Sequence, residues 1–215
     1  MRKVDTTWSP ELAYAIGLIT TDGTLSKDGR HLALVSKDKQ QLENFLQALK
    51  LKNKIGTHFS GSGKKAFRVQ FGDVHFYNFL LDIGLMPNKS KILGNLKIPK
   101  VYFFDFLRGH FDGDGTFYAY WDPRWRSSFM FYTTFISASR RHIQWLQMCL
   151  KQLLGITGHI TKGVSMSVYQ LKYAKAESLK LLPKLYYDRR ILSLLRKRLK
   201  IERALKGGEI TMPRW

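Results

Sequence analysis

Two aspartates, each at the end of an apolar segment, are the residues of this chain best placed to do chemistry. Asp22 follows the segment LAYAIGLITT, and Asp114 follows FLRGHFDG. Each segment has a glycine, Gly17 or Gly109, inside an expected helix, where glycine costs roughly 1 kcal/mol relative to alanine. Because both segments carry this unfavourable residue, we expect the two helices to pack closely through the glycines. Their last turns would then bring Asp22 and Asp114 together.

The second segment could also be a calcium loop or a plain turn. An EF-hand loop that begins at Asp112 needs an oxygen ligand at its fifth position, glycine at its sixth and glutamate at its twelfth. The chain has Thr116, Phe117 and Pro123 at these places, so the loop fails at two of them. A hairpin turn at Asp-Gly accounts for one segment. It does not account for the apolar helix with an internal glycine that precedes both.

Two carboxylates at adjoining helix ends are unfavourable unless a cation lies between them. Like charges repel, and the helix macrodipole disfavours negative charge at a helix C-terminus. Oxygen ligands without cysteine or clustered histidine select a hard ion, Mg²⁺ first and Mn²⁺ as its substitute. Beside a phosphate backbone, such an ion activates water and stabilises the leaving oxygen. These residues therefore predict phosphodiester hydrolysis.

The charge of the chain indicates a polyanionic partner. Its 215 residues include 36 Lys and Arg against 16 Asp and Glu, which gives a net charge of +20 and a sequence pI near 10.1. This excess predicts a nucleic acid partner, and the alternative is a cationic surface that only keeps the protein in solution. Cys149 is the single cysteine, which excludes an internal disulfide and a cysteine-rich zinc site.

The distribution of apolar residues predicts an intracellular protein. The longest stretch without Asp, Glu, Lys or Arg covers residues 127–139, which is too short to span a bilayer. The first residues lack the continuous apolar core that is typical of a signal peptide. We therefore expect a protein of the cytoplasm, the nucleoid or an organelle matrix, neither secreted nor held in a membrane.

The chain repeats itself after about 100 residues. The two Asp-Gly segments correspond to each other, and residues 34–49 correspond to residues 135–150. Each copy has the apolar periodicities of helix, strand, strand, helix, strand, strand and helix. We predict an α+β protein of two tandem αββαββα repeats, with an N-terminal half at residues 1–98 and a C-terminal half at residues 99–215.

Three local patterns add detail to this prediction. Ser9 is expected to cap the first helix, with Gly23 as the C′ glycine at its other end. An insertion at residues 120–128 lengthens the second copy, and its two Trp and two Arg suit either DNA contact or a cover over the core. Residues 184–206 have nine Lys and Arg in a pattern typical of one amphipathic helix with a basic face.

One strand of each copy alternates between apolar and long polar side chains. Arg68 and Gln70 share one face of the first strand, and Gln170 and Lys172 occupy the corresponding positions in the second copy. The pattern is typical of an ordinary half-exposed sheet. Long donor side chains at matching positions also suit a β-ribbon that reads base edges in the major groove.

The segments AIGLITTDG (15–23) and LRGHFDGDG (107–115) resemble the two copies of the motif that names the LAGLIDADG homing endonucleases. Two copies in one chain resemble the monomeric, pseudo-symmetric branch. The segments GLMPNKSKIL (84–93) and LYYDRRILSLLRKRLKIE (185–202) resemble the basic segments that follow the last strands of each half. The resemblance implies a LAGLIDADG fold with motif helices at the interface of the halves and a saddle of antiparallel sheets over double-stranded DNA.

The resemblance also implies roles for individual residues. Asp22 and Asp114 would hold Mg²⁺, while Lys89 and Lys197 would orient water and the scissile phosphate. Ca²⁺ is expected to bind without supporting cleavage. The implied metal-binding set is Asp22, Asp114, Thr21 and Gly113. The set expected to contact DNA is Ser36, Lys37, Arg68, Gln70, Ser137, Ser139, Arg140, Gln170, Lys172, Arg124 and Arg126.

The implied function is a sequence-specific DNA endonuclease that makes a double-strand break in a long, imperfectly palindromic site, as in intron homing. The halves differ in their expected reading residues, so the halves of the site should differ too. The alternative is a protein that kept the fold and lost cleavage: a splicing maturase that binds structured intron RNA, or a DNA-binding regulator. The presence of both Asp22 and Asp114 favours the endonuclease.

Overall fold

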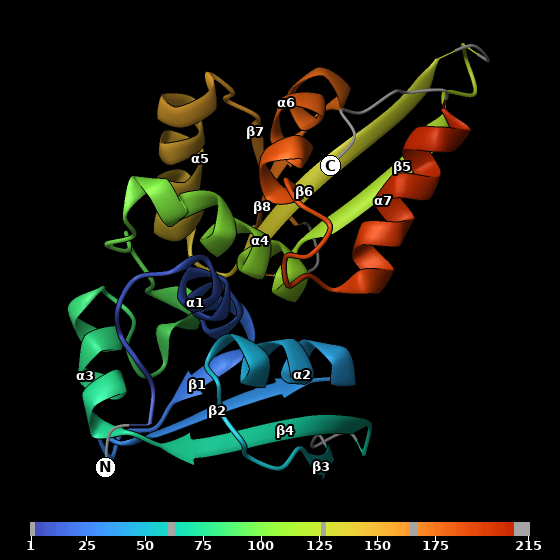
Figure 1. The fold of residues 1–215 in the computed structure, drawn as a ribbon. Helices are drawn as coiled ribbons and strands as arrows, with labels where there is room; N and C mark the ends of the chain where they lie inside the picture. Colours follow the sequence, from blue (N-terminus) through green and yellow to red (C-terminus); the bar gives the residue numbers. More distant parts are fainter. Residues whose placement is uncertain (1–2, 60–62, 126–127, 164–166, 209–215) are drawn as a thin grey trace. The chain divides into compact units, whose positions relative to one another are not determined.

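The computed structural model describes residues 3–59, 63–125, 128–163 and 167–208, and it divides into two compact units (Figure 1). Unit 1 contains residues 1–113 and 192–194, and unit 2 contains residues 114–191 and 195–215. The division after residue 113 differs from the repeat boundary expected after residue 98. The first helix of the second repeat is counted with unit 1, because it packs against the first helix of the chain.

Unit 1 contains the first αββαββα repeat and most of one further helix. Its elements are α1 (Pro10–Asp22), β1 (Gly23–Leu25), β2 (His31–Ser36), α2 (Lys39–Ala48), β3 (Gly56–Phe59), β4 (Lys65–Gly72), α3 (Val74–Asp82), two 3-10 helices (Lys89–Lys91 and Lys100–Tyr102) and α4 (Phe103–Asp114), whose last residue is counted with unit 2. The strand order is β1-β2-β4-β3, and every pair is antiparallel.

Unit 2 continues the second repeat. Its elements are β5 (Thr116–Trp121), β6 (Phe129–Ser137), α5 (Arg140–Leu154), β7 (His159–Lys162), β8 (Tyr169–Tyr173), α6 (Lys175–Leu185) and α7 (Leu195–Gly207). The strand order β5-β6-β8-β7 is again antiparallel and repeats the order of unit 1. The predicted α+β fold of two αββαββα repeats is confirmed, with α7 added at the end.

Helices cover one face of each sheet and leave the other face open. In unit 1, the Phe71 ring on β4 lies 6.3 Å from the Phe45 ring of α2 and 6.2 Å from the Phe76 ring of α3. Arg68 and Gln70 on the same strand are exposed on the opposite face. In unit 2, α5 and α6 contact β6 and β8. The predicted alternation of apolar and polar faces is therefore confirmed for β4.

The predicted N-terminal cap of α1 is confirmed, and the predicted C-terminal glycine conformation is not. Ser9 caps the N-terminus as predicted, since its Oγ accepts a hydrogen bond from Leu12 N at 3.1 Å. The C-terminal prediction was wrong: Gly23 is extended, with φ −85° and ψ 149°, and starts β1 directly. A Cβ at Gly23 would lie 2.6 Å from Ile19 Cα. Glycine is required there by close approach to the helix, and a left-handed conformation plays no part.

Two further predictions need correction. Residues 184–206 do not form one helix, because α6 ends at Leu185 and α7 begins at Leu195. The insertion at residues 120–128 is partly strand, since β5 extends to Trp121. In the part of the chain that the structure describes, no helix is long and apolar enough to cross a membrane.

Candidate metal site and nucleic-acid interface

Helices α1 and α4 meet within unit 1 at the two motif glycines. A Cβ at Gly17 would collide with the Phe106 carbonyl oxygen and lie 2.6 Å from His110 N. A Cβ at Gly109 would collide with the Tyr14 carbonyl oxygen and lie 3.1 Å from Gly17 Cα. Only glycine allows two backbones to approach this closely. The expectation that these two glycines form the motif-helix contact agrees with this packing.

Replacement of Gly109 by alanine is expected to destabilise the protein by about 3 kcal/mol, because the new methyl group meets rigid backbone. Gly94→Ala is the matched control, since a Cβ there meets no atom within 4 Å, and its effect should stay within about 0.5 kcal/mol. Urea unfolding followed by tryptophan fluorescence measures both. Equal midpoints for the two variants would contradict the close helix contact.

The last turns of α1 and α4 also approach each other. A Cβ at Gly113 would collide with the Thr21 hydroxyl and lie 2.8 Å from Asp22 Oδ2. The Thr21 hydroxyl donates to Leu18 O at 3.0 Å, as is usual for threonine in a helix. Gly113 is the residue directly before Asp114 in the sequence. Within unit 1, the backbone that leads to the second motif aspartate is thus adjacent to the first.

The Asp22 carboxylate accepts a hydrogen bond from Gln41, a residue that the sequence patterns did not assign to the site. Gln41 Nε2, on α2, donates to Asp22 Oδ2 at 2.5 Å, and Gln41 is 2% exposed. Gln41 Oε1 accepts from the Ser36 hydroxyl at 2.9 Å, which fixes the direction of the amide. One signal in the sequence could have found it: Gln41 shares the helical period of the apolar residues Leu42 and Phe45, so it falls on the buried face of α2.

Each unit places a lysine on the carbonyl that follows its motif aspartate. In unit 1, Lys89 is 6% exposed and its ammonium donates to Gly23 O. In unit 2, Lys197 Nζ donates to Gly115 O at 2.6 Å. The two lysines come from different contexts, a 3-10 helix and the first turn of α7, yet they make the same contact. This agreement follows the duplication of the chain.

Comparison with known proteins gives matches to solved structures alone. No family model matches the sequence, and neither does any curated protein. The structure of the homing endonuclease I-WcaI bound to its DNA recognition sequence matches with a TM-score of 0.62 and 16% identity, over 92% of this chain and 88% of that one. The chain has the LAGLIDADG fold.

Two further structures share this fold. A variant of I-DmoI, in complex with its target DNA in the presence of Mg²⁺, matches with a TM-score of 0.55 and 13% identity over 84% of this chain and 97% of that one. Full-length DUF199/WhiA from Thermatoga maritima matches with a TM-score of 0.58 and 15% identity over 97% of this chain. The present chain spans 64% of that protein. At these identities the matches show the fold alone. The activity has to be inferred from the residues of this chain.

The serines at the end of the second strand of each LAGLIDADG repeat have a local structural role. Ser36 Oγ accepts from Asp38 N at 3.1 Å, and Ser137 Oγ accepts from Ser139 N at 3.1 Å. Ser139 is 1% exposed, and its hydroxyl caps α5 by accepting from His142 N. Since its side chain is buried in a cap, we remove Ser139 from the residues expected to contact DNA.

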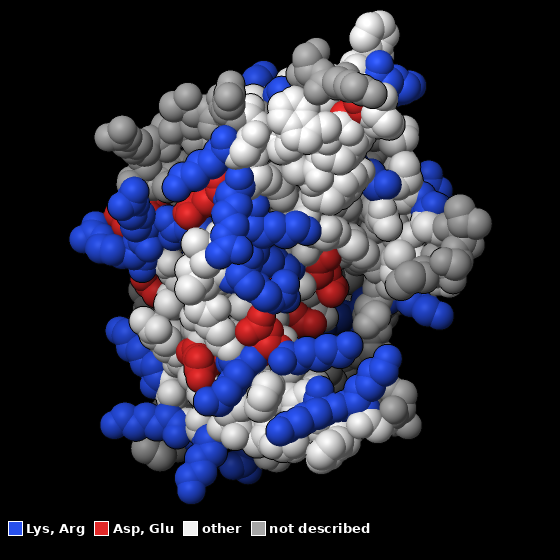
Figure 2. All heavy atoms as spheres, turned by 90° about the vertical axis from the view of Figure 1, so that its right-hand side faces the viewer, with Lys and Arg blue, Asp and Glu red and all other residues white. Residues whose placement is uncertain are grey.

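Most of the other residues expected to contact DNA lie at the surface. Lys37, Arg68, Gln70 and Arg140 are exposed, Gln170 and Lys172 are half-buried on β8, and Arg124 is exposed and paired with Asp122 at 3.1 Å. Arg126 lies outside the described residues. Figure 2 shows Lys and Arg side chains spread over the face in view, with fewer acidic side chains among them.

A buried polar cluster in unit 1 anchors the chain segment 192–194. Asp112 Oδ2 accepts from Leu194 N at 2.7 Å and from the Tyr14 hydroxyl at 2.8 Å. Arg108 Nε donates to Leu192 O at 2.9 Å, and Asn44 Nδ2 donates to Ser193 O at 2.9 Å. Burial, followed by the charge of Asp112, raises the pKa of Tyr14 well above its ordinary value, so the phenol remains a donor.

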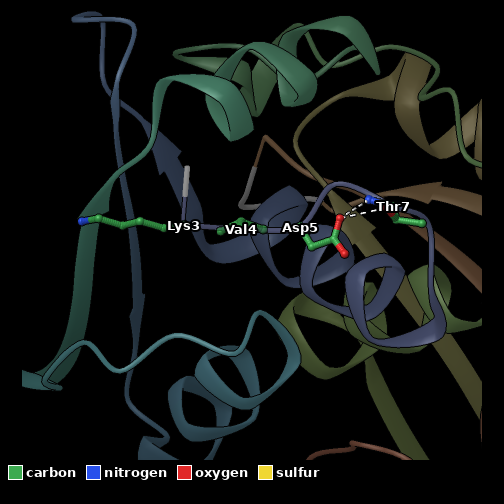
Figure 3. A pocket seen from close by; sticks show the side chains of 4 residues that line it. All are labelled: Lys3, Val4, Asp5 and Thr7. Atoms are coloured by element: carbon green, nitrogen blue, oxygen red, sulfur yellow. Dashed lines mark hydrogen bonds between the residues drawn. The ribbon is translucent and has the colours of Figure 1, made fainter. Parts of the chain in front are cut away.

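A surface pocket ahead of α1 is lined by Lys3, Val4, Asp5 and Thr7. Asp5 Oδ1 accepts hydrogen bonds from Thr7 N at 3.0 Å and from the Thr7 hydroxyl at 2.8 Å (Figure 3). This is a local turn stabilised by an aspartate side chain. The lining contains none of the expected site residues, so the pocket is separate from the candidate metal site.

The donor set around Asp22 fits a hard cation. Among the described residues, no three His, Cys, Asp or Glu side chains gather as a metal-binding group. Mg²⁺ does not require such a group, because it commonly binds one or two carboxylates together with waters and substrate phosphates. The carboxylate of Asp22 is oriented by Gln41, so an oxygen ligand is already fixed in place.

Proposed function

We propose that this chain is a sequence-specific DNA endonuclease that makes a double-strand break in a long, imperfectly palindromic site by metal-dependent phosphodiester hydrolysis. One observation carries the proposal: in each unit, a lysine ammonium donates to the carbonyl directly after the motif aspartate. A pair of such sites, each with one aspartate carboxylate and one lysine ammonium, suits a substrate with two similar strands. The LAGLIDADG fold and the net charge of +20 support DNA as that substrate.

The proposed metal-binding residues are the motif aspartates Asp22 and Asp114, together with Thr21 and Gly113. Bound Mg²⁺, or Mn²⁺ in its place, would supply an activated water and stabilise the leaving oxygen. Gln41 keeps the Asp22 carboxylate in one orientation. The Lys89 and Lys197 ammonium groups provide positive charge where negative charge develops on the phosphate.

The open faces of the two sheets would contact the DNA. On the open face, Arg68 of β4 pairs with Gly56 on one side and Val35 on the other, and Gln70 pairs with Ala33, so both long side chains have shorter neighbours. Long side chains in this setting can extend to base edges. We propose a duplex DNA partner bound by one copy of the chain, in the compartment that holds that DNA. I-WcaI is described as bound to its DNA recognition sequence.

A selection on random duplex DNA tests the proposal. The protein is incubated with the library in Mg²⁺ and, separately, in Ca²⁺, and both cut and bound molecules are sequenced. We expect defined cuts in Mg²⁺ and the same sites bound without cuts in Ca²⁺. Specific binding with no cut in Mg²⁺ or Mn²⁺ would overturn the nuclease assignment.

That outcome would favour a second candidate, a LAGLIDADG protein that binds without cleavage, as a DNA-binding regulator or a splicing maturase. One observation keeps this candidate open. The fold also occurs in DUF199/WhiA, whose N-terminal domain matches with a TM-score of 0.57 and 17% identity and is described by its LAGLIDADG domain without reference to an endonuclease.

Replacement of Lys89 by methionine is expected to lower the cleavage rate at saturating DNA by about 100-fold, because one positively charged group is lost from the site. Lys91→Met is the matched control, since Lys91 ends the same 3-10 helix but is exposed. Single-turnover cleavage and duplex binding in Ca²⁺ are measured for both variants. If both variants lose binding and cleavage together, Lys89 contributes only general charge.

A further inference from the structure

Three tyrosines form a patch on the open face of the second sheet. Tyr118 and Tyr120 lie on β5 and Tyr132 on β6, and Tyr118 is directly opposite Tyr132 in the register. On the other side of the same strands, Phe117 and Phe131 are buried, with ring centroids 5.6 Å apart. Tyr118 and Tyr120 are each 39% exposed. We call Tyr118, Tyr120 and Tyr132 the tyrosine patch.

The rings of the patch are stacked on one another. Tyr118 lies 5.1 Å from Tyr132 with an interplanar angle of 15°, and 6.3 Å from Tyr120 with an angle of 8°. Desolvation, followed by the neighbouring Tyr132, raises the pKa of Tyr120 above its ordinary value, so its phenol stays protonated. The patch is therefore preformed, with the Tyr118 ring against both of its neighbours. A partner can contact the ring edges and hydroxyls without disturbing this stack.

The patch is continuous with the face proposed to contact DNA. Tyr132 and Lys172 lie on the same side of the sheet, because Thr134, which is 2% exposed, alternates to the side of Tyr132 on β6 and pairs with Lys172. At the opposite end of the hairpin, Arg124 is exposed on the turn that follows β5. Positive side chains near both ends of the patch suit a phosphate backbone that passes over it.

Among the described residues of the first sheet, no aromatic side chains occupy the positions that correspond to Tyr118 and Tyr120. β1 ends at Leu25, whereas β5 continues to Trp121. The residues that correspond to Tyr118 and Tyr120 are Ser26 and Asp28, which follow β1. The open face of unit 1 therefore combines Arg68 and Gln70 with the shorter Ala33 and Val35, whereas that of unit 2 adds an aromatic surface.

We propose that the tyrosine patch contacts thymine C5-methyl groups in the major groove of the half-site bound by unit 2. The thymine methyl is the apolar group that a base pair presents in this groove, and apolar side chains recognise it. Ring edges can approach it without separation of the stacked rings, whereas an inserted base would have to separate them. The inference rests on the DNA binding in the proposed function and is independent of cleavage.

Replacement of thymine by uracil tests the inference, because it removes the methyl group and keeps base pairing. The probe is a duplex obtained from the selection, and binding is titrated in Ca²⁺. The selection is repeated with Lys172→Ala. The half of the site in which this variant accepts more sequences than wild type is the half-site of unit 2. In that half we expect uracil to weaken wild-type binding about fourfold per contacted methyl. The same change in the other half should have a smaller effect.

Variants of the patch complete the test. Tyr118→Ser/Tyr120→Ser is expected to bind thymine and uracil duplexes equally, whereas Tyr118→Phe/Tyr120→Phe, which keeps the rings, should retain the thymine preference. Tyr187→Ser is the control, since Tyr187 is 45% exposed and lies outside the strands. Circular dichroism checks that each variant is folded.

Several results would overturn the inference. Equal wild-type affinity for thymine and uracil duplexes would do so, as would a selected half-site without thymine. Tyrosine-dependent binding of single-stranded DNA that exceeds duplex binding would assign the patch to base stacking instead. Absence of any selected DNA would overturn the proposed function as well, and that failure is seen before uracil is introduced.

Discussion

Asp22→Asn is expected to lower DNA cleavage by on the order of 10³-fold or more, because it removes a negatively charged metal ligand from the proposed site. The fold should persist. Asparagine has nearly the same shape, and its carbonyl oxygen can still accept the hydrogen bond from Gln41 Nε2 that reaches Asp22 at 2.5 Å. Binding in Ca²⁺ should stay within a few-fold of wild type.

The measurement is single-turnover cleavage of the selected duplex, with binding titrated in parallel. Asp114→Asn should show the same separation of cleavage from binding. Asp82→Asn is the matched control, since Asp82 also ends a helix, α3, but is exposed. Cleavage within tenfold of wild type for both Asp22→Asn and Asp114→Asn would remove the aspartates from the mechanism.

The fold could be predicted from the sequence because several local signals agreed with one another. The strand alternation around Arg68 and the helical spacing around Phe45 are strong periodic patterns, and the duplication presented each pattern twice. The glycines Gly17 and Gly109 added a contact between segments far apart in the sequence, because glycine in a helix interior is unfavourable unless another group must approach the backbone closely.

The partners of the site residues could not be predicted in the same way. Gln41 contacts Asp22 because α2 packs against α1, and no local pattern in either segment indicates where the two helices meet. Lys89 was found only through a resemblance, since it is one of 36 Lys and Arg and only its burial distinguishes it. Ser139 is the opposite case. Its position after a strand predicts contact with DNA, but its hydroxyl is the buried cap of α5.

The end of the chain shows a different limit. Residues 184–206 have a continuous amphipathic pattern, yet the helix breaks between Leu185 and Leu195. The break contains the segment 192–194, whose backbone groups are held by Arg108, Asn44 and Asp112 from other elements. Long-range hydrogen bonds compensate the lost helical ones. A pattern read within one segment cannot reveal such partners.

Arg108→Met is expected to destabilise the protein by about 3–5 kcal/mol, the usual cost of breaking a buried ion pair. Arg108 is 2% exposed, and one of its terminal nitrogens lies 2.9 Å from Asp105 Oδ1. Its guanidinium also stacks over the Tyr14 ring at 5.3 Å and donates to Leu192 O. Methionine fills much of the volume but removes the positive charge that lies beside the buried Asp105 carboxylate. Urea unfolding measures the loss.

Arg190→Met provides the control, because Arg190 forms an exposed ion pair with Asp188 at 2.9 Å and should matter by less than about 1 kcal/mol. The double variant Arg108→Met/Asp105→Leu removes both charges and should recover part of the stability, since the desolvation of each ion is no longer required. Recovery would assign the loss to the buried negative charge of Asp105 that Arg108 no longer balances. A double variant as unstable as Arg108→Met would assign it to the hydrogen bond with Leu192, and therefore to the anchoring of residues 192–194, from which α7 and Lys197 follow directly in the chain.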